Sequence, residues 1–375
     1  MAEALGWLAL ALTLAGLGWA AMAGRAVWRL AAAAPARAPA LPASVLKPLH
    51  GADPALAANL AATLGQRHAA PFEVLAGVND VADAAAPVAK AAFADAPDAR
   101  LLAGGAVLGP NRKVSQLIHL AAAARHGVLV IADADMAVPP HWLTAVTAPL
   151  AEPGVGLVTC LYRGEPADGA LWSRLGALWI DWQFLPNAAL GEAFGQAQGC
   201  YGATMALRAE TLAALGGFES LVGLLADDHA LGVAVRRLGL RVVVAPVIPG
   251  HVQAEPSLLA LARHELRWLR TLRLLNLPGY AGMVVTFPLV WGAVAALLLP
   301  GWGPWALAAG LAGRLGLALA VDRALGRGVR PGLLALLPLR DALSFAIWGF
   351  GLARGTVVWQ GRRYRMDRDG GMIEA

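Results

Sequence analysis

The chain begins with an apolar run, Ala4–Gly24, that contains no charged residue. A helix of this length rises about 30 Å, which matches the hydrocarbon core of a bilayer. A cleaved signal peptide is the alternative, but Glu3 precedes the run without any Lys or Arg, and the run is too long for the apolar part of such a peptide. We therefore expect a retained transmembrane anchor over 1–33. Cations follow it at Arg25, Arg29 and Arg37, which predicts an N-terminus outside and a following chain in the cytosol.

A second apolar block runs without a charge between Arg273 and Arg314. Turn-forming residues interrupt it at Pro300, Gly301, Gly303 and Pro304. These breaks predict two spanning helices, about 280–299 and 305–321, joined by a tight turn. Arg314 falls inside the second helix, so we expect it to face protein or to reach the membrane interface.

A third apolar segment, 332–359, is interrupted by Arg340 and Asp341. Full crossing would place the cations that follow it outside, against the positive-inside rule. These cations are Arg362, Arg363, Arg365 and Arg368. We therefore expect a re-entrant or interfacial segment, within a C-terminal membrane region over 276–360 and ahead of a tail over 361–375.

The composition supports a membrane location, since 58% of the residues are hydrophobic and only 15% are charged. Soluble chains have about 45–50% apolar and about 25% charged residues. The net charge of +5 does not indicate a nucleic-acid partner, because no long basic run is present and the arginines lie beside apolar segments, where they suit anionic lipids. Two cysteines, Cys160 and Cys200, exclude a disulfide scaffold, and we expect both to be buried free thiols.

Residues 42–275 have the pattern of an α/β domain on the cytosolic side. Five short apolar runs predict buried strands at Ser44–Leu49, Phe72–Val78, Val128–Ala132, Val155–Leu161 and Arg241–Ala245. Stretches with helical periodicity, such as Pro54–Leu64 and Lys113–Arg125, separate them. This alternation predicts a doubly wound, Rossmann-like sheet. In such sheets ligands bind beyond the carboxyl ends of the strands.

Acidic residues follow two of these strands. Asp80 comes after the second run, and Asp133 and Asp135 come after the third. Carboxylates at strand ends can accept hydrogen bonds from a nucleotide, and a pair one residue apart can hold a divalent cation on a diphosphate. They also suit ordinary turns and helix caps. The pattern alone leaves both interpretations open.

Three further groups could take part in chemistry. Asn111 and Lys113 open a helix after a Gly-rich turn, which suits a phosphate as well as an ordinary helix start. Asp227 and Asp228 begin an amphipathic helix, where they could cap it or act as a general base. The third group is His264, Arg267 and Trp268. An Arg-Trp pair next to a membrane block is usually an interfacial anchor, but Arg267 could also bind a leaving diphosphate.

The order of these pieces is more specific than any one of them. It resembles glycosyltransferase family 21, a family 2-like group that contains the ceramide glucosyltransferases and bacterial hopanoid-pathway relatives. The resemblance is carried by SVLKPLHGADP (44–54), GVND (77–80), GPNRKVSQL (109–117), IADAD (131–135), ADDHAL (226–231) and HELRW (264–268). The segments 155–175 and Trp359–Met366 are most similar to the hopanoid-associated subgroup.

The resemblance implies a GT-A fold and a role for each motif residue. Asp228 would be the catalytic base. Asp133 and Asp135 would serve ribose, diphosphate and a Mg²⁺ or Mn²⁺ ion. Substrate contacts would come from Lys47, Asp80, Asn111, Lys113, Asp133, Asp227, His264, Arg267 and Trp268. In one respect the chain departs from the ceramide enzymes, because their last motif begins with Gln or Arg where this chain has His264.

The expected reaction is inverting transfer of a sugar from a UDP-sugar to a lipid hydroxyl. The first expectation is UDP-N-acetylglucosamine and a hopanoid polyol, bacteriohopanetetrol. Alternatives are ceramide with UDP-glucose, a polyprenyl-phosphate acceptor, and a membrane scaffold without activity. The expected location is the bacterial inner membrane, with several spans and a cytosolic catalytic domain.

Overall fold

The computed structural model describes residues 1–375 except 35–38, 354, 360–361, 367–370 and 375. Arg37, Arg368 and part of the Trp359–Met366 motif therefore lie outside the described residues. The chain forms two compact units. The helical unit comprises 1–33, 169–196 and 255–363, and the sheet unit comprises 34–168, 197–254 and 364–375. The predicted catalytic domain was one continuous stretch, 42–275, whereas the structure places 169–196 and the whole last motif, 264–268, with the membrane helices.

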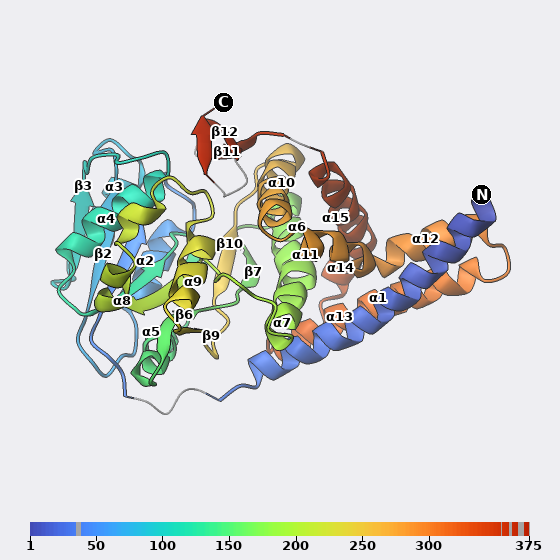
Figure 1. The fold of residues 1–375 in the computed structure, drawn as a ribbon, viewed down its shortest axis with the longest axis horizontal. Coiled ribbons are helices and arrows are strands. Elements are labelled where there is room, and N and C mark those ends of the chain that lie inside the picture. Colours follow the sequence, from blue (N-terminus) through green and yellow to red (C-terminus); the bar gives the residue numbers. More distant parts are fainter. Residues whose placement is uncertain (35–38, 354, 360–361, 367–370, 375) are drawn as a thin grey trace. The chain divides into compact units, whose positions relative to one another are not determined.

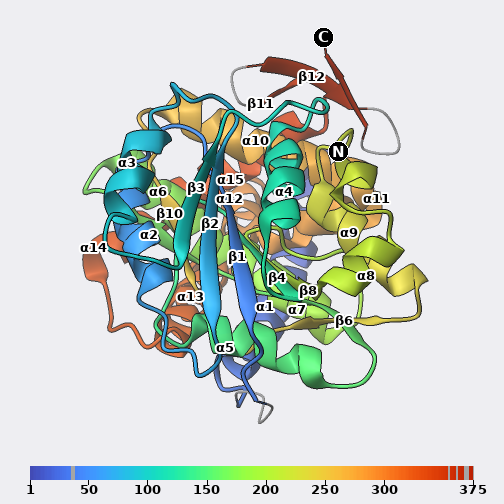
Figure 2. The same ribbon diagram turned by 90° about the vertical axis from the view of Figure 1, so that its left-hand side faces the viewer.

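The sheet unit is built on a mixed seven-stranded sheet with the order β3-β2-β1-β4-β8-β6-β9. Neighbouring strands are parallel except at β8, which runs antiparallel to both β4 and β6. Figure 2 shows β3, β2 and β1 side by side, with α4 next to them. The structure thus confirms the predicted α/β class with a Rossmann-like mixed sheet.

The strand predictions are confirmed with small shifts at their ends. The five predicted strands are β1 (Ala43–Pro48), β2 (Phe72–Val78), β4 (Val128–Ala132), β6 (Val155–Thr159) and β9 (Arg241–Val244). The sequence reading missed β3 (Ala99–Ala103) and β8 (Thr204–Arg208). β3 is an edge strand with only partly buried residues, so it lacks the continuous apolar run of a central strand.

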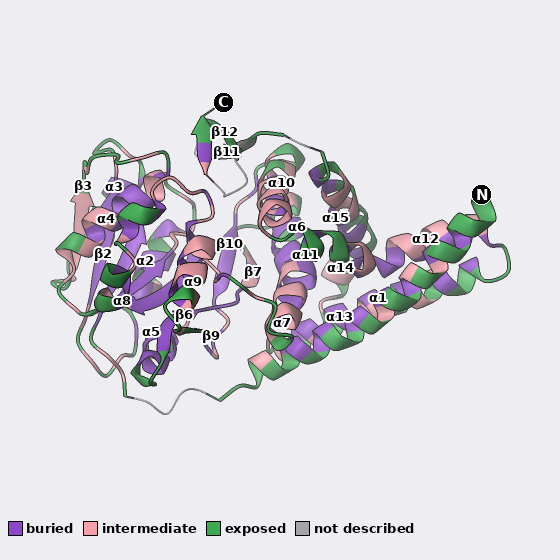
Figure 3. Cartoon of the chain, viewed as in Figure 1, coloured by how far each residue is buried: buried purple, intermediate pink, exposed green. Residues whose placement is uncertain are grey.

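Helices cover the sheet by burying their apolar faces on it. They are α2 (Leu56–Leu64), α3 (Ala85–Ala92), α4 (Arg112–Ala123), α5 (Trp142–Thr147), α8 (Ala209–Ala214) and α9 (Asp227–Arg237). On one face, Leu117 and Leu120 of α4 pack with Leu46, Leu75 and Ile131 of the strands. Figure 3 shows the central strands as a buried layer. This packing fixes the start of α4 near the carboxyl ends of the strands.

A small second sheet continues from the strand ends. It has the order β5-β10-β7, with β5 (Met136–Ala137), β7 (Arg163–Pro166) and β10 (Gly250–Gln253). β10 pairs antiparallel with β5, so that His251 lies opposite Met136. This register brings His251 next to the acidic turn that precedes β5.

The helical unit contains the predicted membrane segments. Its elements are α1 (Ala2–Ala31), α6 (Leu171–Trp179), a π-helical segment (Ile180–Phe184), α7 (Leu185–Ala193), α10 (Leu258–Leu275), α11 (Leu277–Gly282), α12 (Pro288–Leu298), α13 (Gly303–Ala324), α14 (Pro331–Leu334) and α15 (Leu337–Gly351). Helices α1 and α13 are long and apolar enough to cross a membrane. The pair Leu277–Thr286 and Pro288–Leu298 is bent by 58° and could count as a third span.

Small residues let the apolar helices approach closely. Helices α1, α12 and α13 pack along one another, as Figure 1 shows. A Cβ added at Gly303 would come within 2.2 Å of the Ala295 carbonyl oxygen, and one at Gly310 would come within 2.5 Å of the Pro288 carbonyl oxygen. Close backbone contact of this kind is typical of helices that associate in a membrane.

Several charged residues of the helical unit are buried and paired, among them Arg314, Asp341 and Arg340. Arg314 donates to both carboxylate oxygens of Asp341 at 2.7 Å and to the Trp182 carbonyl oxygen at 3.1 Å. The expectation that Arg314 faces protein is therefore confirmed. Arg340 forms a second forked pair, with Glu265. Helix α15 spans about 22 Å at the usual rise, which is less than a bilayer core, and its re-entrant placement stays a prediction.

Candidate functional site

The acidic turn after β4 is the centre of the candidate site in the sheet unit. Asp133 and Asp135 follow the last residue of β4, and Asp80 follows β2. Asp133 and Asp135 are partly exposed, whereas Asp80 is exposed and accepts a hydrogen bond from the Ala82 amide. Parallel β1, β2 and β4 all end at this edge of the sheet, as the sequence pattern predicts.

Two lysines contact Asp133, one through its carboxylate and the other through its backbone carbonyl oxygen. Lys113, in the first turn of α4, lies 2.6 Å from Asp133 Oδ1. Burial would lower the pKa of Lys113, but Asp133, Asp227 and Asp228 together raise it above its ordinary value. Lys47 of β1 is fully buried, and its Nζ donates to the Asp133 carbonyl oxygen at 3.0 Å. Burial lowers the pKa of Lys47 to about 8, against the opposing charges of Asp135 and Asp133. Its direct contact with substrate stays a prediction.

The carboxylate of Asp135 has one buried oxygen and one oxygen that faces a histidine. Its Oδ1 is buried and has no hydrogen-bond partner among the described residues, and its Oδ2 lies 3.6 Å from His251 Nε2. Carboxylate oxygen is a suitable donor for Mg²⁺ or Mn²⁺, whereas imidazole nitrogen suits a transition-metal ion better than it suits Mg²⁺. No group of three His, Cys, Asp or Glu side chains suited to a metal occurs in the described chain. A cation here would therefore take further ligands from phosphate and water, as Mg²⁺ commonly does.

His251 is the functional candidate that sequence reasoning missed. It lies far along the chain from Asp135, and only the β5–β10 pairing brings the two together. The Gln253 amide contacts His251 Nδ1 at 2.8 Å and so orients the ring. The contacting atom is the Gln253 amide nitrogen, so cation binding at Nε2 requires the Gln253 amide to turn until its oxygen accepts from a protonated Nδ1. The sequence gives only a weak indication of a functional role for His251, namely its position directly after Pro249 and Gly250.

Asp227 and Asp228 occupy the first turn of α9, as expected. Burial raises the pKa of Asp227 to about 6, and it raises the pKa of Asp228 as well, although Lys113 opposes both shifts. Asp228 accepts hydrogen bonds from the backbone amides of His229 and Gly202. A Cβ at Gly202 would lie 2.6 Å from Asp228 Oδ2, so only glycine leaves this carboxylate in place.

Asn111 has a structural role that the sequence pattern also allowed. It is fully buried and caps α4, its side chain accepting from the Val114 amide at 3.1 Å. Its amide group donates to the Leu224 carbonyl oxygen at 2.7 Å and to Asp227 Oδ1 at 3.3 Å. Asn111 therefore ties the start of α4 to the start of α9, which brings Lys113 near the two aspartates. Its contact with substrate stays a prediction.

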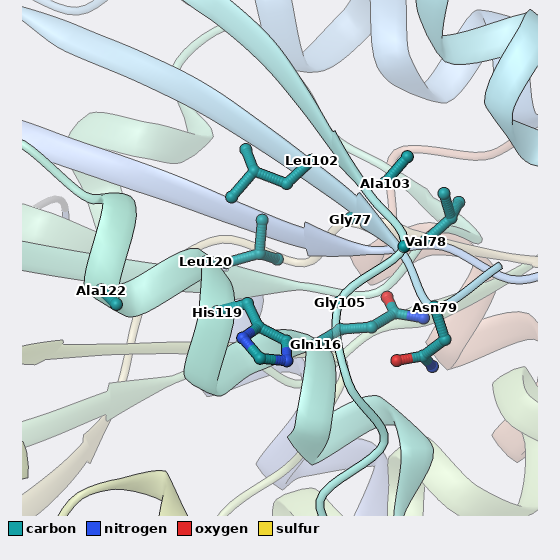
Figure 4. Close-up of a pocket in the computed structure, with 11 residues that line it drawn as sticks. Gly77, Val78, Asn79, Leu102, Ala103, Gly105, Gln116, His119, Leu120 and Ala122 are labelled. Atoms are coloured by element: carbon teal, nitrogen blue, oxygen red, sulfur yellow. The ribbon is translucent and has the colours of Figure 1, made fainter. Parts of the chain in front are cut away.

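A cavity of about 400 Å³ lies between the ends of β2 and β3 and helix α4. Figure 4 shows Asn79, Gln116 and His119 around it, with Leu102 and Leu120 on the apolar side. The Gln116 side chain accepts from the Leu49 amide and donates to the Leu49 carbonyl oxygen. Asn79 donates to the Arg112 carbonyl oxygen, but its Oδ1 is buried and has no partner among the described residues. Asn79 Oδ1 is thus an unmatched acceptor in the wall of the cavity.

The last motif lies on α10 in the helical unit. His264 Nδ1 is 2.6 Å from Glu255 Oε1, and its ring packs edge-on against Trp268 at 4.5 Å. The Trp268 ring lies 5.2 Å from Trp179 of α6. Arg267 is partly exposed. The membrane-anchor interpretation of Arg267 and Trp268 is thus incomplete, since Trp268 belongs to a packed aromatic group.

The two cysteines, Cys160 and Cys200, do not form a disulfide bond. Both are free. Cys160 is buried, as expected, but Cys200 is only partly buried, and its sulfur contacts the Asp228 carbonyl oxygen at 2.9 Å. Burial raises the pKa of both thiols. Neither thiol is therefore an activated nucleophile.

Comparison with known proteins gives one family match and several similar structures. The model of glycosyl transferase family 21 matches residues 8–372. The mannosyltransferase PcManGT from Pyrobaculum calidifontis, solved in complex with GDP-Man and Mn²⁺, is 23% identical, with 94% of this chain and 97% of that chain covered and a TM-score of 0.49. S. aureus TarS 1–349, solved with UDP-GlcNAc, is 13% identical, with 89% and 99% covered and a TM-score of 0.40. The family assignment rests on the family model.

Proposed function

Because the chain belongs to glycosyl transferase family 21 and is a glycosyltransferase, we propose that it transfers a hexose or N-acetylhexosamine from a UDP-sugar to a hydroxyl group of a membrane lipid. The first choice is UDP-N-acetylglucosamine and bacteriohopanetetrol, and ceramide with UDP-glucose is the second. A polyprenyl-phosphate acceptor is the third. The observation that carries the proposal is a partly buried Asp228 carboxylate with a raised pKa, in the electrostatic neighbourhood of Lys113 and Asp133.

Asp228 is the general base of the proposed reaction. It takes the proton of the acceptor hydroxyl while the hydroxyl oxygen bonds to the anomeric carbon of the sugar. The bond from that carbon to the diphosphate breaks, and its electron pair leaves with UDP, so the anomeric configuration inverts. A raised pKa suits this task, because a base works best when its pKa is closer to the working pH.

The donor nucleotide is the proposed ligand of the strand ends. The imide N–H of uracil would meet the unmatched Asn79 Oδ1 in the cavity beside α4. Asp80 and Asp133 then serve the ribose, and Lys113 the phosphates. Asp227 supports Asp228 from the same turn.

A divalent cation is the proposed cofactor, Mg²⁺ or Mn²⁺. Asp135 and His251 would hold it, since Asp135 Oδ1 is buried with no partner in the described part of the chain and His251 Nε2 lies beside the same carboxylate. When bound, such a cation neutralises charge on a departing diphosphate. Asp133 as a second carboxylate ligand stays a prediction, because its Oδ1 is already engaged by Lys113.

The helical unit supplies the acceptor side of the proposal. Arg267 would bind the leaving diphosphate as a fixed fork of donors, and Trp268 and His264 would support it. The apolar helices would hold the lipid in the bacterial inner membrane, with the catalytic sheet in the cytosol. Two helices long enough to span, and a third if the bent pair is counted, support several crossings.

Purified enzyme should be assayed with UDP-glucose and UDP-N-acetylglucosamine, each offered with ceramide and with bacteriohopanetetrol. We expect product from UDP-N-acetylglucosamine and bacteriohopanetetrol. Product with ceramide alone would overturn the first choice of acceptor, and a polyprenyl phosphate serves as the third acceptor. No product and no UDP binding would contradict the reaction class assigned to this site.

Asp228→Asn tests the base. We expect transfer to fall by about 10²–10⁴-fold, with UDP binding and thermal unfolding close to those of the wild type. Asp95→Asn, a change at an exposed aspartate of the same unit, is the matched control and should keep full activity. Near-normal transfer by Asp228→Asn would show that another group is the base.

A further inference from the structure

Arg340 lies in α15, outside every motif. Its guanidinium group is buried and donates four hydrogen bonds to residues of three helices. Its side chain is 1% exposed. Its Nη1 and Nη2 donate to the two carboxylate oxygens of Glu265 at 2.8 Å each. Nη1 also donates to the Leu175 carbonyl oxygen at 3.2 Å, and Nε donates to the Ser344 hydroxyl at 3.1 Å. One guanidinium therefore connects α15, α10 and α6.

Glu265 is part of the last motif and lies on the buried side of α10. The residues of α10 that are buried recur at helical spacing: Leu261, Glu265 and Leu269. Successive residues of a helix are about 100° apart. A fixed Glu265 therefore fixes the directions in which His264, Arg267 and Trp268 leave the helix. Glu265 is the one charged residue of this buried row.

The same guanidinium also sets the distance between α10 and α6. Leu175, whose carbonyl oxygen accepts from Arg340, lies one turn before Trp179. Trp179 packs against Trp268 with ring centres 5.2 Å apart. Arg340 thus restrains both helices that carry the Trp179–Trp268 contact, on either side of it.

A second buried fork in the same unit provides a comparison. Arg314 and Asp341 pair through two bonds of 2.7 Å, and both side chains are buried to the same degree as Arg340 and Glu265. This pair joins α13 to α15 and contacts the carbonyl oxygen of Trp182, but it includes no residue of α10. The two pairs therefore match in chemistry and burial and differ in their connection to the motif.

We propose that Arg340 is a positioning residue of the transferase, which through Glu265 sets the orientation of α10 and so the direction in which Arg267, the proposed ligand of the leaving diphosphate, leaves that helix. The inference rests on the proposed function of Arg267. A lysine could not replace Arg340 in this role. Its ammonium group cannot make the two parallel hydrogen bonds to Glu265 that fix the rotation of α10 about its axis.

The test must separate positioning from simple stabilisation. A buried ion pair can often be replaced by apolar residues of similar volume without loss of stability. The double variants Arg340→Met/Glu265→Met and Arg314→Met/Asp341→Met remove each fork while keeping the sites filled. UDP affinity is measured by calorimetry with Mn²⁺ on full-length protein in detergent. Thermal unfolding is followed in parallel.

We expect Arg340→Met/Glu265→Met to weaken UDP binding about tenfold, since a small misplacement of a binding group has large effects. Arg314→Met/Asp341→Met should change UDP affinity less than twofold. Arg340→Lys, which keeps the charge and folds without a new cavity, should weaken UDP binding in the same direction. Equal losses from both double variants would overturn the inference.

A variant cycle gives the decisive measurement. In a background of Arg267→Gln, removal of the Arg340–Glu265 fork should have less than a twofold further effect, because the group that it aims is gone. A full loss in that background would also overturn the inference. If the wild-type protein binds no UDP at all, the proposed function fails and the inference fails with it. If it binds UDP and the fork has no effect, only the inference fails.

Discussion

At the scale of single residues, Lys113 interacts with three carboxylates of the candidate site. Lys113 contacts Asp133 and acts electrostatically on Asp227 and Asp228. Burial raises the pKa of both α9 aspartates, and Lys113 holds them lower than burial alone would. The ionisation of the proposed base therefore depends on this lysine.

The pH profile of transfer is the first prediction at this scale. A raised pKa means that Asp228 binds its proton at a higher pH than an ordinary aspartate, whose pKa is about 3.9. The acid limb of kcat/KM should therefore lie above that value. Lys113→Met removes a positive charge that favours the carboxylate, so the limb should move to higher pH. The exposed Lys90→Met is the control and should leave it in place. A limb that moves to lower pH in Lys113→Met would contradict this electrostatic account.

Gly202→Ala is the second prediction. The added methyl group would lie 2.6 Å from Asp228 Oδ2 and must displace the carboxylate. We expect kcat to fall by about tenfold or more, with little change in UDP affinity. Gly127→Ala, where an added Cβ meets nothing within 4 Å, is the control. Unchanged kcat in Gly202→Ala would show that the position of Asp228 is not important.

Single residues also show what the sequence can and cannot predict about the site. The positions of Asp133, Asp135 and Asp228 follow from local patterns, because strand ends and helix starts are short-range features. Lys47 was identified by resemblance and Asn111 also by its place at a helix start, but their buried, structural contacts depend on packing. His251 was missed because its partner is brought to it only by long-range strand pairing.

At the scale of elements, the parallel strands were predictable and the antiparallel one was not. Buried parallel strands form continuous apolar runs, as in β2 and β4. The strand β8 has the sequence TMALR, which is short and reads equally well as part of a helix. Its position between β4 and β6 depends on tertiary pairing. The placement of the third apolar segment, 332–359, was harder still to predict, because the charged partners of Arg340 and Asp341 lie on other helices.

The ion pairs of the helical unit give a prediction about stability. Removing one partner of a buried pair leaves an unpaired charge and costs about 3–5 kcal/mol. Asp341→Ala should therefore strongly lower the free energy of unfolding, because Arg314 would remain buried. Glu152→Ala breaks the exposed pair with Arg241 and should cost about 0–1 kcal/mol. Denaturant unfolding in detergent measures both, and similar small losses would contradict the buried character of the Arg314–Asp341 pair.

At the scale of the whole molecule, the apolar composition divides between two uses. Part of it forms the sheet core, around Leu46, Leu75 and Ile131. The rest forms helices whose outer residues are exposed apolar side chains, such as Trp7, Leu14, Trp302 and Trp305. Exposed apolar surface on long helices is expected where lipid replaces water.

The membrane association of the chain is the prediction at this scale. The protein should stay in the membrane fraction after washing with alkaline carbonate and should be released by detergent. A variant without residues 1–33 should also stay, because α13 and the bent helix pair remain. Release of the full-length chain by carbonate would show that the helices do not insert.

The helical unit is assembled from three stretches of sequence, and this has a consequence for biosynthesis. Asp181 and Trp182 lie in the middle stretch, whereas their partners Arg327 and Arg314 lie in the last one. On the ribosome, α6 and α7 emerge long before these arginines. A nascent chain that stops before Arg314 leaves an acid in an apolar helix without its cation, together with unpaired helix faces. Such a surface is prone to aggregation, so premature termination should yield a product that quality-control proteases remove.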